Sequence, residues 1–516
     1  MAEPRVENVE TLIVGGGPVG LAASIELSRH EISSLLVEKH PDTSLFPKAR
    51  LISTRTMEIL RSWGLQDEVE RAGMPREDVL AVGVGTSLSA DDYLRKAAAI
   101  AEDAAQSPTY TYLCSQDVLE VIMRRVAASA ADVRFGATMT DLRIEPGGVA
   151  ATIVADGAAT LVRARYLVAA DGSRGTVRRR LGIAVEGPPP LGHMVSIMFD
   201  ADLGFLPPGR RAALSFVRST PGGAIEAVDN RRRWIMQTGY DPAKGGSAGD
   251  FTEEYCLAAV RSAIGIPDHP VDIVGVMPWL QQAVVAAEFA RDPVYLAGDA
   301  AHVATPQGGF GMNCGIQDAH NLAWKLAAVL RGEAGPRLLD TYAEERRPIA
   351  VRTVDESLVN AMITAQMMAG RLSMNEAIEQ QAGRRGSEGL VLGFHYDSAA
   401  VVPDGTPAPA PADPYRTYVP TARPGHRAPH VWVSPGVSTL DLLGPAFTLL
   451  TAPGSGWAGV PGVRVVEVDS AEWAEVYDVG EQGAVLVRPD GHVGWRTRSA
   501  DHAELEKALD VILSRS

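Results

Sequence analysis

Cysteine is nearly absent from this sequence of 516 residues. Only Cys114, Cys256 and Cys314 occur, and no two of them are spaced as CxxC. An odd number without such a pair argues against a disulfide framework and against a zinc site. Reduced thiols are typical of cytosolic proteins, so we expect a cytoplasmic protein without a metal centre.

Long apolar runs and an excess of positive charge are also lacking. No apolar run approaches the roughly 18 residues of a membrane span. The N-terminal MAEPRVENVE is acidic and leads directly into a predicted strand, so no signal peptide is expected. Lys and Arg total 48 against 63 Asp and Glu, which gives a net charge of −15. Because such a surface repels phosphate backbones and anionic lipids, we expect neither nucleic-acid nor membrane partners.

The chain is long enough for several domains, and its pattern changes along its length. At 516 residues it exceeds what one hydrophobic core usually supports. A βαβ pattern opens it, with strands at 10–14 and 34–37 around a helix at 18–30. The other predicted elements are helices at 51–63, 116–127, 315–330 and 338–379, and strands within 133–168 and at 194–199, 213–217, 234–238, 446–450, 463–468 and 484–488. The strands between 194 and 238 indicate a mostly antiparallel sheet.

The stretch VGGGPVG follows the first strand and opens the first helix. Its Gly15, Gly17 and Gly20 have the GxGxxG spacing, and Glu38 ends the second strand. Such glycines permit a tight turn and let a diphosphate approach the helix N-terminus, while the acid binds ribose hydroxyls. An acid here disfavours a 2′-phosphate, so the motif predicts bound FAD or NAD; a plain tight turn is the alternative. Further predicted cofactor contacts are Pro18, Val19, Lys39 and Met139.

A second glycine-rich loop lies in LAGDAAHVATPQGGFGMN, residues 296–313. This loop favours FAD over NAD as the bound cofactor. An NAD dehydrogenase has no need of such a loop so far along the chain, whereas a flavin extends beyond its diphosphate. We expect Asp299 to hold a ribityl hydroxyl, the bare backbone to lie against the flavin ring, and the following helix N-terminus to stabilise negative charge on a reduced flavin. The predicted FAD contacts in this loop are Gly298, Asp299, Pro306, Gly309, Gly311, Met312 and Asn313, and Pro306, Gly308 and Gly309 are predicted to lie beside the reactive flavin edge.

These motifs, together with LVAADGSRGTVRRRLGI at 167–183, resemble the group A flavoprotein aromatic hydroxylases of the p-hydroxybenzoate and phenol hydroxylase type. The segments GHRAPHVWV, STLDLLG and LVRPDGHVGWR resemble the thioredoxin-like tail of the dichlorophenol and polyketide hydroxylases. The resemblance covers nearly the whole chain. It implies bound FAD, transient NADPH or NADH, O₂, and hydroxylation of a phenolic or polycyclic aromatic small molecule through a C4a-hydroperoxyflavin, by a monomer or homodimer.

The resemblance also implies roles for single residues. Gln116 matches a flavin-contacting glutamine, and Asp171-Gly172 matches a motif linked to FAD and NAD(P)H. The loop FPKAR offers Lys48 or Arg50 as a cation against the flavin, where many relatives have arginine. The candidates for the group that helps a phenol ionise are His193, Arg233 and Tyr240, on the predicted substrate strands.

For several other residues we predict structural rather than functional roles. His302 is predicted as a structural hydrogen-bonding residue and Cys314 as a buried thiol. We predict sheet core positions rather than pocket positions for Met198, Phe216, Trp234 and Met236. Two alternative functions stay open: a Baeyer–Villiger or epoxidising flavin monooxygenase, and a non-catalytic flavin-binding redox protein. A flavin-dependent halogenase is disfavoured because no two tryptophans form a WxW pair.

The predicted fold class is α/β, more broadly a multi-domain α+β protein. A Rossmann-like FAD-binding domain spans 1–180 and resumes with a helical segment at 286–400. An antiparallel-sheet substrate domain occupies 181–285. A Pro-rich linker at 401–422, stiff and extended in its 402–414 portion, precedes a thioredoxin-like domain at 423–516. Because this last domain has no CxxC, dithiol chemistry is excluded there and a packing or assembly role is expected.

Overall fold

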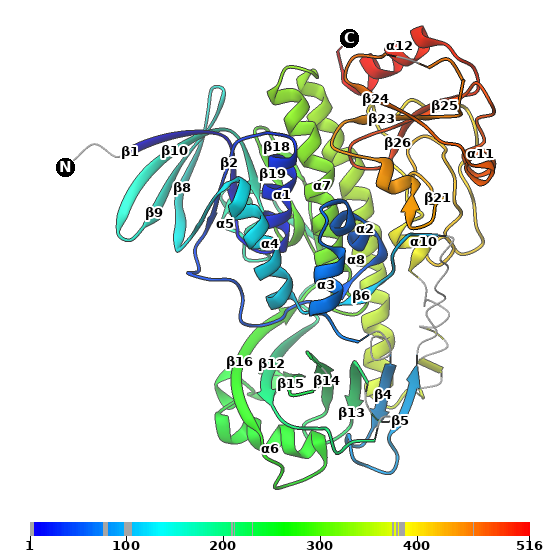
Figure 1. Cartoon of the computed structure of the whole chain (residues 1–516). Helices are drawn as coiled ribbons and strands as arrows, with labels where there is room; N and C mark the ends of the chain where they lie inside the picture. Colours follow the sequence, from blue (N-terminus) through cyan, green and yellow to red (C-terminus); the bar gives the residue numbers. More distant parts are fainter. Residues whose placement is uncertain are drawn as a thin grey trace.

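The computed structural model describes residues 5–75, 81–97, 106–207, 210, 212–229, 231–373, 376–377, 380, 387–457 and 459–515. Figure 1 shows three regions: a large sheet with long helices beside it at the upper left and centre, a second sheet at the bottom, and a smaller C-terminal α/β unit at the upper right. The α/β multi-domain class predicted from the sequence is therefore confirmed.

The first sheet combines strands from distant parts of the chain. Its strands are β1 (Arg5–Val14), β2 (Ser34–Glu38), β7 (Asp132–Phe135), β8 (Ala137–Glu145), β9 (Gly148–Ala155), β10 (Ala158–Ala169), β18 (Ala290–Arg291) and β19 (Val294–Leu296). The order is β18-β19-β10-β1-β2-β7, and β8 and β9 extend it from β10 as antiparallel strands. Strand β1 runs parallel to β2 and β10, and β19 runs parallel to β10. The carboxyl ends of β1 and β19, each followed by one glycine motif, therefore lie at the same edge.

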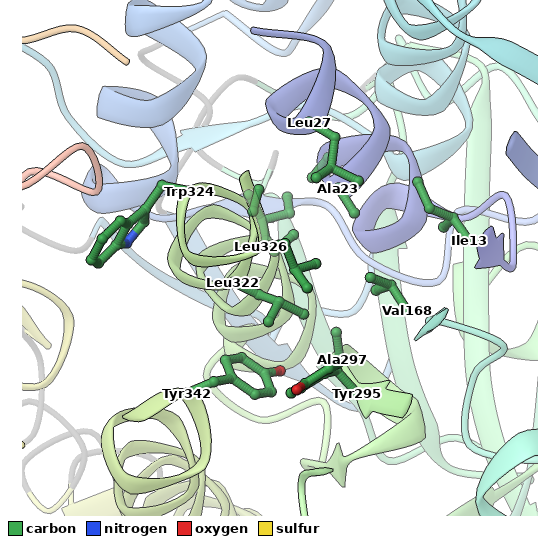
Figure 2. Close-up of a cluster of buried hydrophobic side chains, with 14 of the residues drawn as sticks. Ile13, Ala23, Leu27, Val168, Tyr295, Ala297, Leu322, Trp324, Leu326 and Tyr342 are labelled. Carbon is green, nitrogen blue, oxygen red and sulfur yellow. The ribbon is translucent and has the colours of Figure 1, made fainter. Parts of the chain in front are cut away.

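Both faces of this sheet are covered. The neighbouring Leu12 and Ile13 point to opposite faces, and each is fully buried. The helices of this region are α1 (Pro18–Arg29), α2 (Thr54–Ser62), α3 (Gln66–Ala72), α4 (Gln116–Ala130), α5 (Thr176–Arg180), α7 (Phe310–Leu330), α8 (Asp340–Met368) and α10 (Glu388–Val391). Figure 2 shows Ile13 and Val168 of the sheet in one cluster with Leu27 of α1, Leu322 of α7 and Tyr342 of α8. This packing fixes the position of the α7 N-terminus.

The second sheet has the order β16-β12-β15-β14-β13-β4-β5. Its strands are β4 (Ala81–Gly85), β5 (Leu94–Ala97), β12 (Gly192–Asp200), β13 (Leu214–Val217), β14 (Gly223–Ala227), β15 (Arg233–Tyr240) and β16 (Asp272–Gln281), and α6 (Glu253–Ile264) shares a core with it. Among the strand pairs that the described residues form in this sheet, β13–β4 alone is parallel, so the predicted mostly antiparallel character holds. The predicted range 181–285 misses β4 and β5, because the chain visits this sheet once before α4.

Three local features differ from the predicted elements. The helix expected over 51–63 begins at Thr54, because the Ser53 side chain caps it by accepting a hydrogen bond from the Thr56 N–H. The preceding β3 (Leu51–Ile52) pairs with β6 (Tyr112–Leu113), and a small sheet joins β11 (Val185–Glu186), β17 (Val284–Ala286) and β20 (His302–Val303). Helix α8 ends at Met368, and Glu379, its predicted end, lies outside the described residues. Across the described chain, no helix is both long enough and apolar enough to cross a membrane.

The C-terminal unit has a thioredoxin-like strand order. Its elements are β21 (Trp432–Ser434), β22 (Val437–Ser438), β23 (Phe447–Thr451), β24 (Val463–Glu467), α11 (Ala471–Tyr477), β25 (Ala484–Val487), β26 (Val493–Thr497) and α12 (His502–Ile512). The sheet runs β24-β23-β25-β26, with β23 parallel to β24 and antiparallel to β25. All three cysteines lie outside this unit, so it has no thiol with which to perform redox chemistry.

Buried ion pairs fix the C-terminal unit to the helices. Arg488 donates to both carboxylate oxygens of Glu345 in α8, at 2.6 and 2.8 Å, and Lys325 of α7 reaches the same carboxylate at 2.7 Å. Arg427 pairs with Glu58 of α2. All of these side chains are essentially inaccessible to water. Although 402–414 has no regular element, the unit beyond it is therefore held rigidly against the first region.

Candidate active site

A single cavity of about 1990 Å³ lies between the first sheet, the second sheet and α7. Pockets for one ligand usually measure about 300–1,000 Å³, so this cavity has room for a dinucleotide and a second molecule. Most of the predicted site residues line it: Gly15, Gly17, Pro18, Val19, Glu38, Lys39, Lys48, Arg50, Gln116, Met139, Asp171, Gly172, His193, Tyr240, Asp299, Pro306, Gly308, Gly309, Gly311 and Met312. Four predicted site residues do not line the cavity: Gly20, Gly298, Asn313 and Arg233.

The first glycine motif forms a cradle between β1 and α1. A side chain at Gly15 would collide with the Ala170 carbonyl oxygen at 2.2 Å, and one at Gly20 would collide with the Gly15 carbonyl oxygen at 1.9 Å. A Cβ at Gly17 would have no atom of the described residues within 4 Å, apart from its own chain neighbours. Gly17 also caps α1, whose first turn has neither a side-chain cap nor an acidic residue. The free N–H groups and open space fit a diphosphate, and Gly20 serves packing instead.

Glu38 lines the cavity at the end of β2. Its carboxylate accepts hydrogen bonds from the Gly16 N–H at 2.7 Å and from the His40 N–H at 2.9 Å. These two bonds orient the side chain beside the glycine cradle. A carboxylate held in this way can still accept from two ribose hydroxyls, because each oxygen has a second lone pair.

The second glycine loop leads into α7 on the other side of the cavity. Gly308 and Gly309 have φ values of +111° and +66°, in the region that favours glycine, and Gly309 caps a helix with neither a side-chain cap nor an acidic first turn. Thr305 anchors the loop to α8 by donating to the Ser357 carbonyl at 2.7 Å. The loop thus presents rigid backbone and a positive helix end to the cavity.

Three residues around this loop have distinct positions. The Asp299 side chain is exposed to the cavity, and desolvation by the surrounding protein raises its pKa despite nearby His302 and Lys48. Gly298 instead donates its N–H to Asp318 at 3.0 Å. Asn313 lies beneath the loop and donates to the carbonyls of Leu51 and Gly309 at 2.8 and 2.7 Å. Asn313 and Gly298 therefore shape the loop rather than line the cavity.

The loop after β2 offers two cations in different settings. Arg50 donates to Glu226 of β14 at 2.9 Å and to the carbonyls of Ala213 and Ala227. Lys48 is exposed to the cavity, and among described residues no hydrogen bond or ion pair involves its ammonium group. The structure therefore leaves Lys48 available to a ligand and commits Arg50 to joining the two sheets.

Two further predicted contacts line the nucleotide part of the cavity. Gln116, at the start of α4, donates to Glu120 at 2.6 Å. Asp171 caps α5 through one oxygen, which accepts from the N–H groups of Thr176 and Val177 at 2.6 and 3.0 Å. Its other oxygen is buried without a partner in the described part of the chain. An orphaned acceptor beside the cradle fits a ligand that donates a hydrogen bond.

The second sheet forms the opposite wall. His193 and Tyr240 are cross-strand partners on β12 and β15, and their rings lie 5.3 Å apart at the cavity. Arg233 lies at the other end of β15 and forms a two-pronged ion pair with Asp200 at 2.9 and 3.1 Å. The prediction that Arg233 acts in the site is therefore not supported by its position. The expected core residues Met198, Phe216, Trp234 and Met236 are all absent from the cavity wall.

Several wall residues were missed by the sequence reasoning. Ser196, Gln237 and Trp279 face the cavity from three adjacent strands. The two-residue period of a strand was the available signal, since Ile235 and Gln237 face opposite to Trp234 and Met236. Residues 416–418, within the predicted linker, also line the cavity; nothing in their composition marked them.

A buried cluster beneath the second loop is structural. His302 bonds Asp318 at 2.7 Å, and Arg346 donates to the other Asp318 oxygen at 2.8 Å and to the Cys314 sulfur at 3.4 Å. Burial lowers the pKa of His302, but Cys314 and Asp318 outweigh this and raise it well above its ordinary value. His302, Cys314 and Asp318 are close enough to hold a metal ion, yet the Arg346 guanidinium already neutralises them. The predicted structural role of His302 agrees with this geometry.

Comparisons with known proteins place this site in context. Residues 8–357 match the family described as FAD binding domain, and residues 421–516 match the family described as aromatic-ring hydroxylase, C-terminal. The chain is 38% identical to tetracenomycin A2 monooxygenase-dioxygenase of Streptomyces glaucescens, over 99% of this chain and 98% of that protein.

Two solved structures share the whole architecture. The flavin-dependent monooxygenase PieE in complex with FAD and substrate has a TM-score of 0.89 and 32% identity, over 99% of this chain and 100% of that chain. A ternary complex of aklavinone-11 hydroxylase with FAD and aklavinone has a TM-score of 0.87 and 34% identity, over 100% of both chains.

Proposed function

Because this chain belongs to the FAD-dependent aromatic-ring hydroxylases, we propose that it hydroxylates a polycyclic, polyketide-like phenol. It is an FAD-dependent monooxygenase that uses NAD(P)H and O₂. The observation that carries the finer proposal is the cavity of about 1990 Å³, which continues from the glycine cradles to the wall formed by the second sheet. Relatives named as a tetracenomycin A2 monooxygenase-dioxygenase, an aklavinone-11 hydroxylase and a putative polyketide hydroxylase support a polyketide-like substrate.

The bound flavin supplies reducing equivalents from NAD(P)H and an activated oxygen atom from O₂. The protein holds it, in our proposal, through the α1 N-terminus at Gly17, the Glu38 carboxylate on the ribose, and Asp299 on the ribityl chain. Backbone N–H groups at the start of α7 would stabilise negative charge on the flavin ring. Lys48 adds a positive charge near Asp299 in the same cavity.

The opposite wall orients the substrate and excludes water. We propose that His193 and Tyr240 lie near the phenolic hydroxyl and assist its ionisation, because they are cross-strand neighbours at the cavity. Arg233 takes no part, since Asp200 occupies its guanidinium. Apolar residues of the same wall, among them Ile235 and Met277, would help to keep water from a reactive oxygen species.

The test starts from the visible absorption of the purified protein. We expect a flavin spectrum, followed by substrate-stimulated consumption of NAD(P)H and O₂ with a panel of simple phenols and polycyclic phenols. Incorporation of labelled oxygen as an aromatic hydroxyl group, strongest with polycyclic members, supports the proposal. A lactone or an epoxide product supports the Baeyer–Villiger or epoxidising alternative. Flavin without any O₂-dependent turnover indicates a non-catalytic redox protein.

A further inference from the structure

A chain of hydrogen bonds crosses the second sheet on its cavity face. The Trp279 Nε1 atom lies 2.9 Å from the Ser196 Oγ atom, and that oxygen lies 2.7 Å from Oε1 of Gln237. Ser196 and Gln237 are direct cross-strand partners on β12 and β15. Trp279 lies two residues beyond Met277, the partner of Ser196 on β16. The three side chains therefore form one row along the wall opposite the flavin site.

The chemistry of tryptophan determines which atom donates and which accepts in each hydrogen bond of this row. An indole N–H can donate but never accept, so Ser196 must accept from Trp279. Ser196 is only 3% exposed, and within the described chain its hydroxyl proton has no acceptor other than Gln237. The proton therefore goes to the carbonyl oxygen of the Gln237 amide, since an unused buried donor is costly. The reverse orientation of the amide would leave that proton without an acceptor.

This direction of the hydrogen bonds leaves the NH₂ group of the Gln237 side-chain amide available to a ligand. Its oxygen is taken by Ser196, and its NH₂ group has no hydrogen-bond partner among the residues that the structure describes. Gln237 lines the cavity and is only partly buried. On the basis of the proposed function, we infer that Gln237 is a substrate-positioning residue that donates a hydrogen bond to a carbonyl oxygen of the polycyclic substrate. The row from Trp279 through Ser196 fixes it as a donor.

Two matched ligands isolate this hydrogen bond. Fluorenone and fluorene have the same three rings, but only fluorenone has a carbonyl acceptor. Each is titrated into the oxidised holoenzyme without NAD(P)H, and binding is followed through the flavin absorption spectrum. The measured quantity is the ratio of the dissociation constant of fluorene to that of fluorenone. Differences in apolar contact cancel when this ratio is compared between variants.

We expect Gln237→Leu to lower the ratio about three- to ten-fold, the range for one neutral hydrogen bond. Gln237→Glu keeps an acceptor for Ser196 and lowers the ratio at least as far, because an oxygen then faces the ligand carbonyl. Ser196→Ala lowers it about two-fold, since a free amide presents its donor in only one of two orientations. Ser215→Ala is the control: it is an equally buried serine of the same sheet, bonded to Tyr93 outside the cavity, and it leaves the ratio unchanged.

An unchanged ratio in Gln237→Leu, or an equal loss of affinity for both ligands, overturns the inference, because a merely structural residue would affect both alike. Failure of the wild-type holoenzyme to bind either ligand also overturns it. Flavin content and phenol hydroxylation are measured on the same preparations. A flavin-containing, hydroxylating enzyme with an unresponsive ratio refutes the role of Gln237 alone, whereas a protein without flavin refutes the proposed function.

Discussion

Glu26 illustrates how one buried carboxylate joins three helices. It lies in α1 and accepts hydrogen bonds from Trp63, just after α2, at 2.6 Å and from His320 of α7 at 2.7 Å. Burial alone raises its pKa, but His320, Arg29 and His30 outweigh that effect and lower the pKa to about 2. A carboxylate with a lowered folded-state pKa stabilises the fold above its unfolded pKa and loses this contribution as the pH falls.

We therefore expect Glu26→Gln to be less stable than the wild type by up to about 3 kcal/mol at neutral pH. The difference in the free energy of unfolding between the wild type and Glu26→Gln should shrink by about 2 kcal/mol between pH 7 and pH 3. The reason is that the wild-type carboxylate takes up a proton only on unfolding in that range. Urea unfolding across this pH range measures it. A gap that stays constant with pH would contradict the assignment.

Lys48 and Arg50 lie two residues apart, but we expect Lys48 to contribute to FAD binding and Arg50 to contribute to the stability of the fold. Because Lys48 is exposed to the cavity and Arg50 is bonded to Glu226, we expect Lys48→Met to weaken FAD binding several-fold with little change in stability. Arg50→Met should lower the free energy of unfolding by about 1–3 kcal/mol by leaving Glu226 and two carbonyls unpaired. Equilibrium dialysis with FAD and thermal unfolding distinguish the two. The opposite pattern would place Arg50 at the flavin.

Sequence reasoning could identify residues whose role depends on the local backbone, but not those whose role depends on distant partners. The glycines and Glu38 belong to a short βαβ unit, whose spacing alone brings them together. Arg233 was predicted for the site only from its place on a predicted substrate strand, and the structure instead pairs it with Asp200 on the neighbouring strand, away from the cavity. Ser196, Gln237 and Trp279 were missed because only the strand order makes them neighbours.

At the scale of elements, the glycine motif that joins β1 to α1 and enters the first turn of α1 has two kinds of glycine. A side chain at Gly20 meets protein backbone, whereas one at Gly17 meets empty space. Packing therefore explains Gly20, while a side chain at Gly17 would enter the space that we propose for the diphosphate.

We expect Gly17→Ala to fold with less than about 1 kcal/mol change in stability, as for an ordinary helix-cap substitution. Its affinity for FAD should fall at least about ten-fold, because the methyl group enters the space proposed for the diphosphate. Gly20→Ala should instead cost about 1–3 kcal/mol of stability through overpacking. Thermal unfolding without FAD and FAD titration make the comparison. An unchanged FAD affinity in Gly17→Ala would exclude this diphosphate position.

At the scale of the whole molecule, the C-terminal unit is part of the enzyme body. Arg488, Glu345 and Lys325 form a buried charge cluster that spans the unit and both long helices. Burial lowers the pKa of Lys325 to about 8 even with Glu345 beside it. The buried charges of the cluster are therefore stable only while their partners are present. The sequence predicted the linker and the domain beyond it, but not this cluster, because a charged residue looks the same whether exposed or buried.

Arg488→Met is expected to lower the free energy of unfolding by about 3–5 kcal/mol, since Glu345 loses a two-pronged partner inside the protein. Arg515→Met removes an exposed ion pair with Asp510 and an exposed hydrogen bond to the Glu333 carbonyl, and it should change the free energy of unfolding by less than about 1 kcal/mol. Chemical unfolding of both variants provides the measurement. Equal effects would mean that the C-terminal unit is only loosely attached.

The pairing of β19 with β10 also determines when this enzyme becomes able to hold its coenzyme during synthesis. The ribosome must deliver the whole second sheet before β19 emerges, and until then one edge of β10 lacks its parallel neighbour. A nascent chain can form the cradle at Gly17 early but cannot close it before the α7 N-terminus is made. We therefore expect flavin capture to be a late event, and we expect an unfinished chain to carry an open sheet edge that favours aggregation.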